Sequence, residues 1–275
     1  MAKNAEEVKQ IMDGCGIACY GVCSFARVQD MLLPCRAQSR LPEGAASVIV
    51  IAFPYSLGDE AYRDTNISRY AAVKDYHLVA SRYLENVSAK LKQAFPEEEF
   101  VPFTDNSPVP EVFTAACAGL GVIGQNGLLI HKEYGSWVFL GEIVTTLALQ
   151  GTGGNPAKCC GCQACVCACP TGALASKDIG QCLSRITQKK GELLPEEEKL
   201  LLKHGCAWGC DICQLVCPEN QKVRATEIKE FLESFHPVAS VGEPLEEKAY
   251  AWRGRKVVER NLSLLERNQT CGKHH

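Results

Sequence analysis

From residue 47 onward, the spacing of apolar residues predicts strands and helices that alternate along the chain. The run Ser47–Phe53 is apolar, rich in β-branched residues and ended by Pro54, which predicts a buried strand. Over residues 70–95 apolar side chains recur in steps of three and four, which is typical of an amphipathic helix. A second strand is predicted at residues 100–103, before the turn-forming segment 105–108. Residues 47–103 are therefore predicted to form a strand, a helix and a second strand.

The same alternation continues to about residue 150. We predict a helix over residues 110–118 and strands near residues 128–131 and 137–149. Strand, helix, strand, helix, strand and strand in this order indicate a mixed α/β (α+β) layer domain over residues 1–150.

Beyond this domain we predict two further parts. Residues 151–222 begin with a Gly-rich hinge and hold most of the cysteines, and residues 223–275 form a short helical tail. The tail should contain helices near residues 226–235 and 257–265.

Eleven of the 17 cysteines lie between residues 159 and 217. Cys159, Cys162, Cys165 and Cys169 form the pattern C-x2-C-x2-C-x3-C-P, the bacterial ferredoxin spacing whose fourth thiolate binds the other cluster of a pair. A shorter run, Cys210, Cys213 and Cys217-Pro218, repeats the end of this pattern. The spacing predicts a bacterial-ferredoxin-like domain with two [4Fe–4S] clusters.

Two such clusters need eight thiolates, and the two runs supply seven, so Cys182 is the natural eighth ligand. The alternatives are structural zinc, which needs four thiolates and no Cys-Pro step, and disulfides, which suit short secreted chains. Cys160, Cys167 and Cys206 fall off the spacing and are interpreted as spare thiols.

Composition adds little that is specific. A net charge of −3 gives no overall attraction to nucleic acid, and no apolar run reaches the length of a membrane span. The first residues lack the basic and apolar regions of a secretory signal, so we expect a cytoplasmic protein without a membrane partner. Cysteines 15, 19, 23 and 35 match no cluster spacing and are interpreted as small buried hydrophobes.

These features together resemble the epoxyqueuosine reductase family, which is cobalamin-dependent and carries two [4Fe–4S] clusters. The matching stretches are Ser47–Phe53, Ser68–His77, Asp105–Glu111, Ala118–Asn126, Tyr134–Ile143, the cysteine-rich region and Trp252–Asn261.

The resemblance implies that the chain reduces epoxyqueuosine in tRNA to queuosine. Electrons from an external low-potential donor would pass through both clusters to a cobalamin held by the α/β domain. The resulting cob(I)alamin is a nucleophile able to attack an epoxide carbon. Asp105 aligns with the catalytic acid of the family, and burial against the corrin is expected to raise its pKa. From its own sequence context, Asp105 also suits a residue that begins an Asx-turn.

The resemblance also implies the ligands of each cofactor. Cluster one takes Cys159, Cys162, Cys165 and Cys217, and cluster two takes Cys169, Cys182, Cys210 and Cys213. The cobalamin contacts carry over to Arg36, Ser68, Leu129, Leu140, Ser184 and Asp211. His77 lies in an Asp-x-His sequence that is similar to a cobalt-binding motif, but Ala80 replaces the glycine of that motif, so we expect a helix-surface or core-edge histidine.

The tail is shorter than the helical repeats with which many family members help to hold tRNA. We interpret it as a remnant of that repeat domain, where Arg253, Arg255, Lys256 and Arg260 either contact tRNA or form a solvated face. Two alternatives remain open: a corrinoid iron–sulfur reductase of another substrate, and a non-catalytic two-cluster electron carrier.

Overall fold

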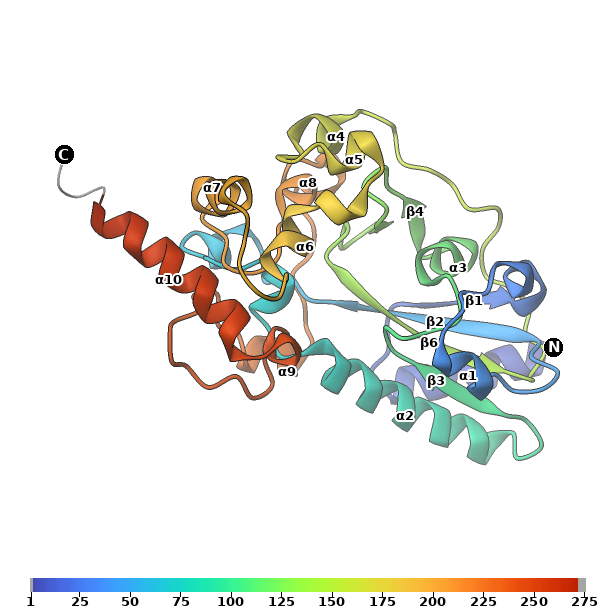
Figure 1. Ribbon diagram of the computed structural model, residues 1–275. Coiled ribbons are helices and arrows are strands. Elements are labelled where there is room, and N and C mark those ends of the chain that lie inside the picture. Colours follow the sequence, from blue (N-terminus) through green and yellow to red (C-terminus); the bar gives the residue numbers. More distant parts are fainter. Residues whose placement is uncertain (1, 272–275) are drawn as a thin grey trace. The chain divides into compact units, whose positions relative to one another are not determined.

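The computed structural model describes residues 2–271 (Figure 1). Its contacts group the chain into two compact units, one made of residues 1–54 and 76–161 and the other of residues 55–75 and 162–275. The three-part domain division drawn from the sequence stays a prediction.

A four-stranded antiparallel sheet forms the centre of the first unit, with strand order β1-β2-β6-β3. Every residue of β2 is buried, which explains why this strand reads as a continuous apolar run rather than an alternating one. A separate two-stranded sheet pairs β4 with β5. The strands are β1 (Tyr20–Ser24), β2 (Ser47–Pro54), β3 (Phe100–Phe103), β4 (Gly121–Ile123), β5 (Leu129–His131) and β6 (Val138–Thr145).

Helices cover both faces of this sheet, and Figure 1 shows α2 (Tyr76–Ala94) and α3 (Glu111–Cys117) on opposite sides of it. Side chains of a strand point alternately to its two faces. Phe53 of β2 therefore packs against Tyr83 of α2, with ring centroids 5.9 Å apart, while Val50 joins the cluster that contains Ala115 of α3. Helix α1 (Ala2–Gly14) packs against α2.

Helix α2 begins at Tyr76, six residues later than the apolar periodicity predicts. Residues 69–71 form a short 3-10 helix instead, and Ala71 and Ala72 are each only 1% exposed in the core of the second unit. The periodicity therefore runs across two separately packed segments. The predicted strand at residues 100–103 is confirmed, and the predicted helix at 110–118 corresponds to α3.

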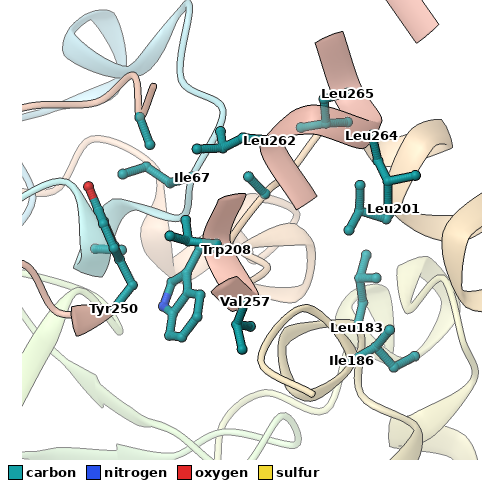
Figure 2. Close-up of a cluster of buried hydrophobic side chains, with 14 of the residues drawn as sticks. Ile67, Leu183, Ile186, Leu201, Trp208, Tyr250, Val257, Leu262, Leu264 and Leu265 are labelled. Carbon is teal, nitrogen blue, oxygen red and sulfur yellow. The ribbon is translucent and has the colours of Figure 1, made fainter. Parts of the chain in front are cut away.

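Short helices surround an apolar core in the second unit. Figure 2 shows Trp208 and Tyr250 among the aliphatic side chains of this core, and both are fully buried. The predicted tail helices are both present, although the last one is longer than its periodicity indicated. The helices are α4 (Ala164–Ala168), α5 (Ala173–Ser176), α6 (Leu183–Thr187), α7 (Pro195–His204), α8 (Ile212–Leu215), α9 (Lys229–Glu233) and α10 (Arg255–Cys271).

Among the helices of residues 2–271, none combines the length and apolar character needed to cross a membrane.

Candidate functional site

Three thiols of the expected cluster-one set lie close together in the second unit. Cys165 is in α4, which packs against α8, and Cys217 follows α8. Burial raises the pKa of Cys217, and the neighbouring Cys162 and Cys165 thiols raise it further. Cys159, the fourth member of the expected set, belongs to the first unit, where its N–H donates to the Ile123 carbonyl at 3.0 Å.

Three thiols of the expected cluster-two set form a second group. Burial raises the pKa of Cys210 to about 11, and the nearby Asp211, Cys182 and Cys169 add to the increase. Cys213 lies in α8, three residues after Cys210. The structure therefore brings Cys182 to the ferredoxin-like runs, although it is far from them in sequence.

These thiols do not crowd around one point. Within residues 2–271, no three His, Cys, Asp or Glu side chains converge as a single metal ion would require. A zinc site gathers four ligands at roughly 2.3 Å from one ion, whereas each thiolate of a cubane binds a different iron.

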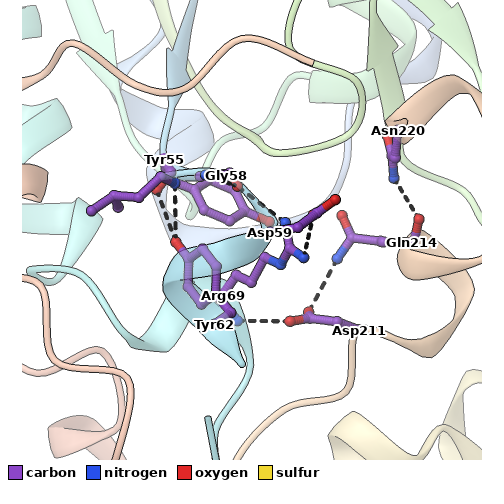
Figure 3. Close-up of polar contacts among 10 residues, drawn as sticks. Tyr55, Gly58, Asp59, Tyr62, Arg69, Asp211, Gln214 and Asn220 are labelled. Atoms are coloured by element: carbon purple, nitrogen blue, oxygen red, sulfur yellow. Dashed lines mark hydrogen bonds and ion pairs between the residues drawn. The ribbon is translucent and has the colours of Figure 1, made fainter. Parts of the chain in front are cut away.

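A buried polar network orders the segment that carries Cys210 and Cys217 (Figure 3). Asp211 accepts a hydrogen bond from the Arg69 backbone N–H at 2.7 Å and another from the Gln214 amide at 3.3 Å. The Arg69 side chain is 4% exposed, and its guanidinium donates to Asp59 at 2.7 Å. Because buried polar groups are costly without partners, these bonds fix the backbone around the thiols.

The first unit holds Asp105 in a tight and unusual loop after β3. Asp105 has a φ of 58°, a left-handed conformation that few residues other than glycine adopt. The Asn106 N–H donates to the Thr104 carbonyl at 2.8 Å, and the Ser107 N–H donates to the Asp105 carbonyl at 2.6 Å. Two consecutive three-residue turns thus hold the loop, and backbone strain of this kind is concentrated at functional sites.

The Asp105 carboxylate interacts with the start of α2. Its Oδ2 lies 3.3 Å from Nε2 of His77, and it also interacts with the Tyr76 side chain. The Tyr76 ring stacks on Phe139 of β6 at 4.3 Å, which holds the phenol in place. The hydrogen bond from His77 lowers the pKa of Asp105 and outweighs the opposing effect of burial. In this structure the pKa of Asp105 is therefore shifted downward, and the rise expected from burial against a corrin stays a prediction.

Two further carboxyl groups lie near the Asp105 loop, and the sequence analysis missed both. Burial raises the pKa of Glu111, in the first turn of α3, to about 8, and the charge of Asp105 adds to the increase. Glu142 of β6 is fully buried, and burial raises its pKa well above the usual range. An acidic residue inside the apolar run of residues 138–145 was the available signal for Glu142.

A cavity of about 420 Å³ opens beside these groups, within the size range of small-molecule sites. Its walls combine carboxyl groups with apolar side chains. They include Asp105, Ser107, Glu111, Leu33, Val109 and Phe113.

Comparisons with known proteins agree on one family. The family model described as "Epoxyqueuosine reductase QueG, DUF1730" matches residues 36–106, and the 4Fe-4S double cluster binding domain matches residues 158–220. The epoxyqueuosine reductase of Gloeobacter violaceus is 40% identical over 205 residues, covering 70% of this chain and 63% of that protein. The Lactococcus garvieae enzyme is 33% identical over 253 residues, covering 82% of this chain and 70% of that protein. The chain belongs to the epoxyqueuosine reductase family.

A crystal structure of an epoxyqueuosine reductase with an epoxyqueuosine-modified tRNA stem loop has the same fold. It aligns with a TM-score of 0.79 and 25% identity, covering 96% of this chain and 81% of that chain. The present chain spans 63% of the length of the Gloeobacter violaceus relative. The double-cluster match places two [4Fe–4S] clusters in the region of residues 158–220.

In the first unit of this epoxyqueuosine reductase family member, the expected cobalamin contacts occupy different surroundings. Leu129 belongs to an apolar cluster against which Leu140 and Ile123 pack, and Ile123 also lines the cavity. Arg36 begins a short 3-10 helix, Arg36–Arg40, and its side chain is exposed.

In the second unit, Ser68 and Asp211 line one pocket of about 130 Å³. Ser68 Oγ is buried, and no other group of the described residues hydrogen-bonds to it, so it is available to a polar group of a ligand. Ser184 accepts a hydrogen bond from the Gln188 amide at 3.3 Å and follows Leu183, which lines the same pocket.

The basic residues of the tail are largely engaged within the protein. Arg260 donates to the carbonyls of Lys189 and Gly191, and Arg255 donates to Glu259 at 3.1 Å. Arg253 lies over the ring of Trp252, 3.9 Å from its centroid, and that indole is 60% exposed. Arg255 and Lys256 remain exposed, whereas Arg253 and Arg260 are partly buried, and the choice between tRNA contact and a solvated face stays open.

The remaining cysteines have varied surroundings. Cys160 and Cys167 are exposed. Cys206 donates weakly to the Trp208 carbonyl at 3.2 Å. Cys23 and Cys117 are buried in contact with each other in the core of the first unit.

Proposed function

We propose that this chain reduces epoxyqueuosine in tRNA to queuosine, with cobalamin as the reactive cofactor and two [4Fe–4S] clusters as the electron relay. The observation that carries the proposal is the strained Asp105 loop beside a cavity in a member of this family. Support for the substrate comes from the related enzyme that was crystallised with an epoxyqueuosine-modified stem loop. The electrons would come from an external low-potential donor.

The cluster ligands follow from the two thiol groups. Cys162, Cys165 and Cys217, with Cys159, would hold cluster one, and Cys169, Cys182 and Cys210, with Cys213, would hold cluster two. The mutual influence of the thiols on the pKa values of Cys217 and Cys210 supports this division. It is also the cross-ligation expected of a ferredoxin-like run, in which the Cys-Pro thiolate binds the other cluster.

Each unit, taken by itself, offers groups that suit a corrin. Ser68 offers a buried hydroxyl without a partner in the described chain, and Leu129 and Leu140 offer apolar surface. Ser184, Asp211 and Arg36 would complete the contacts. When bound, cobalamin would supply a strongly nucleophilic reduced cobalt.

Asp105 would give a proton to the epoxide oxygen. Opening an epoxide places negative charge on that oxygen, and a positioned acid stabilises the charge as it develops. The loop would carry the carboxylate to this position, and the contact with His77 Nε2 at 3.3 Å would orient it. Because His77 lowers the pKa of Asp105, the group is ionised near neutral pH in this structure and must receive a proton before it can act.

Anaerobic reconstitution tests the proposal directly. The protein is loaded with iron, sulfide and cobalamin, and its conversion of epoxyqueuosine-containing tRNA is followed by nucleoside analysis. Retention of both clusters and the corrin with turnover supports the proposal. Retention of all three without turnover of this tRNA indicates another substrate, and two intact clusters without corrin retention indicate an electron carrier.

A further inference from the structure

Two buried carboxyl groups remain without a role in the proposed function. Glu142 is 0% exposed in the middle of β6, and Glu111 lies at the start of α3. Burying an ionised carboxylate without a counter-ion costs much free energy, so a buried carboxyl group of this kind usually keeps its proton. A proton held in this way can also serve a reaction.

Both groups lie beside the Asp105 loop. Glu111 lines the same cavity as the Asp105 loop, and its carboxyl Oε1 is buried and has no hydrogen-bond partner among residues 2–271. Ser107 donates through a short hydrogen bond to Oε2 of Glu142, and the Val109 N–H donates back to Ser107 Oγ at 3.1 Å.

The charges that face Glu111 favour its protonated form. Burial is the main cause of the raised pKa of Glu111 and the negative charge of Asp105 acts in the same direction, whereas the Asp105 backbone and His77 oppose the rise. Glu142 faces Glu111 from β6 and is itself kept neutral by burial and by Glu111. Asp105 therefore begins ionised beside a carboxyl group that still carries its proton at neutral pH.

The stoichiometry of the proposed reaction requires more protons than Asp105 alone can hold. Reduction of an epoxide to an alkene consumes two electrons and two protons and releases one water. The clusters, when present, would supply the electrons, which the proposed function takes from an external low-potential donor. One Asp105 side chain carries at most one proton, so it has to be loaded for the ring-opening step and again for the departure of oxygen as water.

We propose that Glu111 is the proton store that loads Asp105, and that Ser107 and Glu142 hold the loop in the position that allows the transfer. The inference rests on the proposed function. Each transfer accompanies the growth of negative charge on the substrate oxygen: the Glu111 O–H bond breaks, its proton moves to Asp105, and Asp105 passes a proton on to that oxygen in the same step. Glu111 regains a proton from solvent through the cavity. Glu111 thus acts through Asp105 and does not itself touch the substrate.

The test compares Glu111→Gln, which keeps the size of the side chain, with Glu85→Gln, an exposed control on α2. The first measurement needs neither cofactor nor turnover. Infrared difference spectra across a pH titration should show a protonated carboxyl band that is lost near pH 8 in the wild type and in Glu85→Gln and is absent in Glu111→Gln. A band unchanged in Glu111→Gln would overturn the assignment.

The second measurement is the pH profile of single-turnover reduction in the loaded enzyme. Glu111→Gln should lower the rate by about 100-fold, the lower end of general acid catalysis, and should remove the fall in rate above about pH 8. Glu111→Asp should restore part of the rate with a shifted alkaline limb, which a merely structural role would not produce. If Glu111→Gln shows the wild-type rate and the wild-type pH profile, Glu111 is not the proton store, and the proposed function is unaffected. Inactivity of the wild type would refute the proposed function, and the infrared result would then decide the store alone.

Discussion

The two units build their candidate sites in different ways. In the second unit, seven of the eight expected cluster ligands lie between residues 162 and 217, on short helices and the turns that join them. In the first unit, each polar group comes from a different element: His77 from α2, Asp105 from the loop after β3, Glu111 from α3 and Glu142 from β6. Local spacing along the chain therefore encodes the thiol site, whereas only tertiary packing assembles the carboxyl site.

The largest expected effect tests the thiol side of this comparison. Cys182→Ser should remove one cluster, because it deletes the ligand that the ferredoxin-like runs do not supply. The reconstituted protein should hold about half of the wild-type iron and sulfide. Cys160→Ser, which changes an exposed cysteine outside both sets, should keep the full content. Full iron content in Cys182→Ser would show that another residue completes the second cluster.

The next effect belongs to the carboxyl side. Asp105→Asn should reduce turnover of epoxyqueuosine-containing tRNA by about 100-fold to 10,000-fold, the range for loss of a general acid. Both clusters should remain, because the substitution lies in the other unit. Iron content and single-turnover rates measure the two outcomes separately. A variant that works at the wild-type rate would remove Asp105 from the reaction.

The buried acids should also make stability depend on pH. The folded protein binds the Glu111 proton more tightly than the unfolded chain does, because burial raises the pKa to about 8 from its usual 4.5. The unfolding free energy should therefore fall as pH rises from about 4.5 to 8, by on the order of a few kcal/mol from this group.

Glu111→Gln should remove this contribution, so the variant gains stability relative to the wild type as pH approaches 8. Thermal melting under anaerobic conditions at pH 5 and pH 8 measures the difference, with Glu85→Gln as the control. A difference between variant and wild type that does not change with pH would mean that Glu111 titrates normally.

The smallest effect concerns the orientation of Asp105. His77→Phe keeps an aromatic ring beside Tyr76, whose ring lies 4.1 Å from that of His77, but removes the hydrogen bond to the carboxylate. The pKa of Asp105 should then rise, which carbon NMR of the labelled side chain detects. The stabilisation that this pair gives is present above the unfolded pKa of Asp105 and is lost as pH falls. It should stay below about 1 kcal/mol, because both side chains are substantially exposed.

The sequence predicted best those features that depend on the residue pattern within a single segment. The apolar run of β2 and the helical periodicity within α2 led directly to their elements, and the cysteine spacing led to the double-cluster domain. The strand β1 was missed because Gly21 and Cys23 give it no apolar alternation, and its partner β2 supplies the pairing that makes it a strand.

The carboxyl site was predictable only in part. Asp105 came from resemblance to the family, because its own sequence context suits a turn residue equally well. The direction of its pKa shift depends on His77, which lies 28 residues earlier and reaches it only after folding. Glu111 and Glu142 acquire raised pKa values through burial, a property that no short pattern around them records.

Arg260 is already bound to the carbonyls of Lys189 and Gly191 and to the Asn261 side chain. A guanidinium whose donors are held in this way keeps its charge but is not free to pair with a phosphate, so it would displace few counterions from an RNA. The affinity of α10 for an RNA would consequently fall less steeply with salt concentration than the number of arginines and lysines in that helix would suggest.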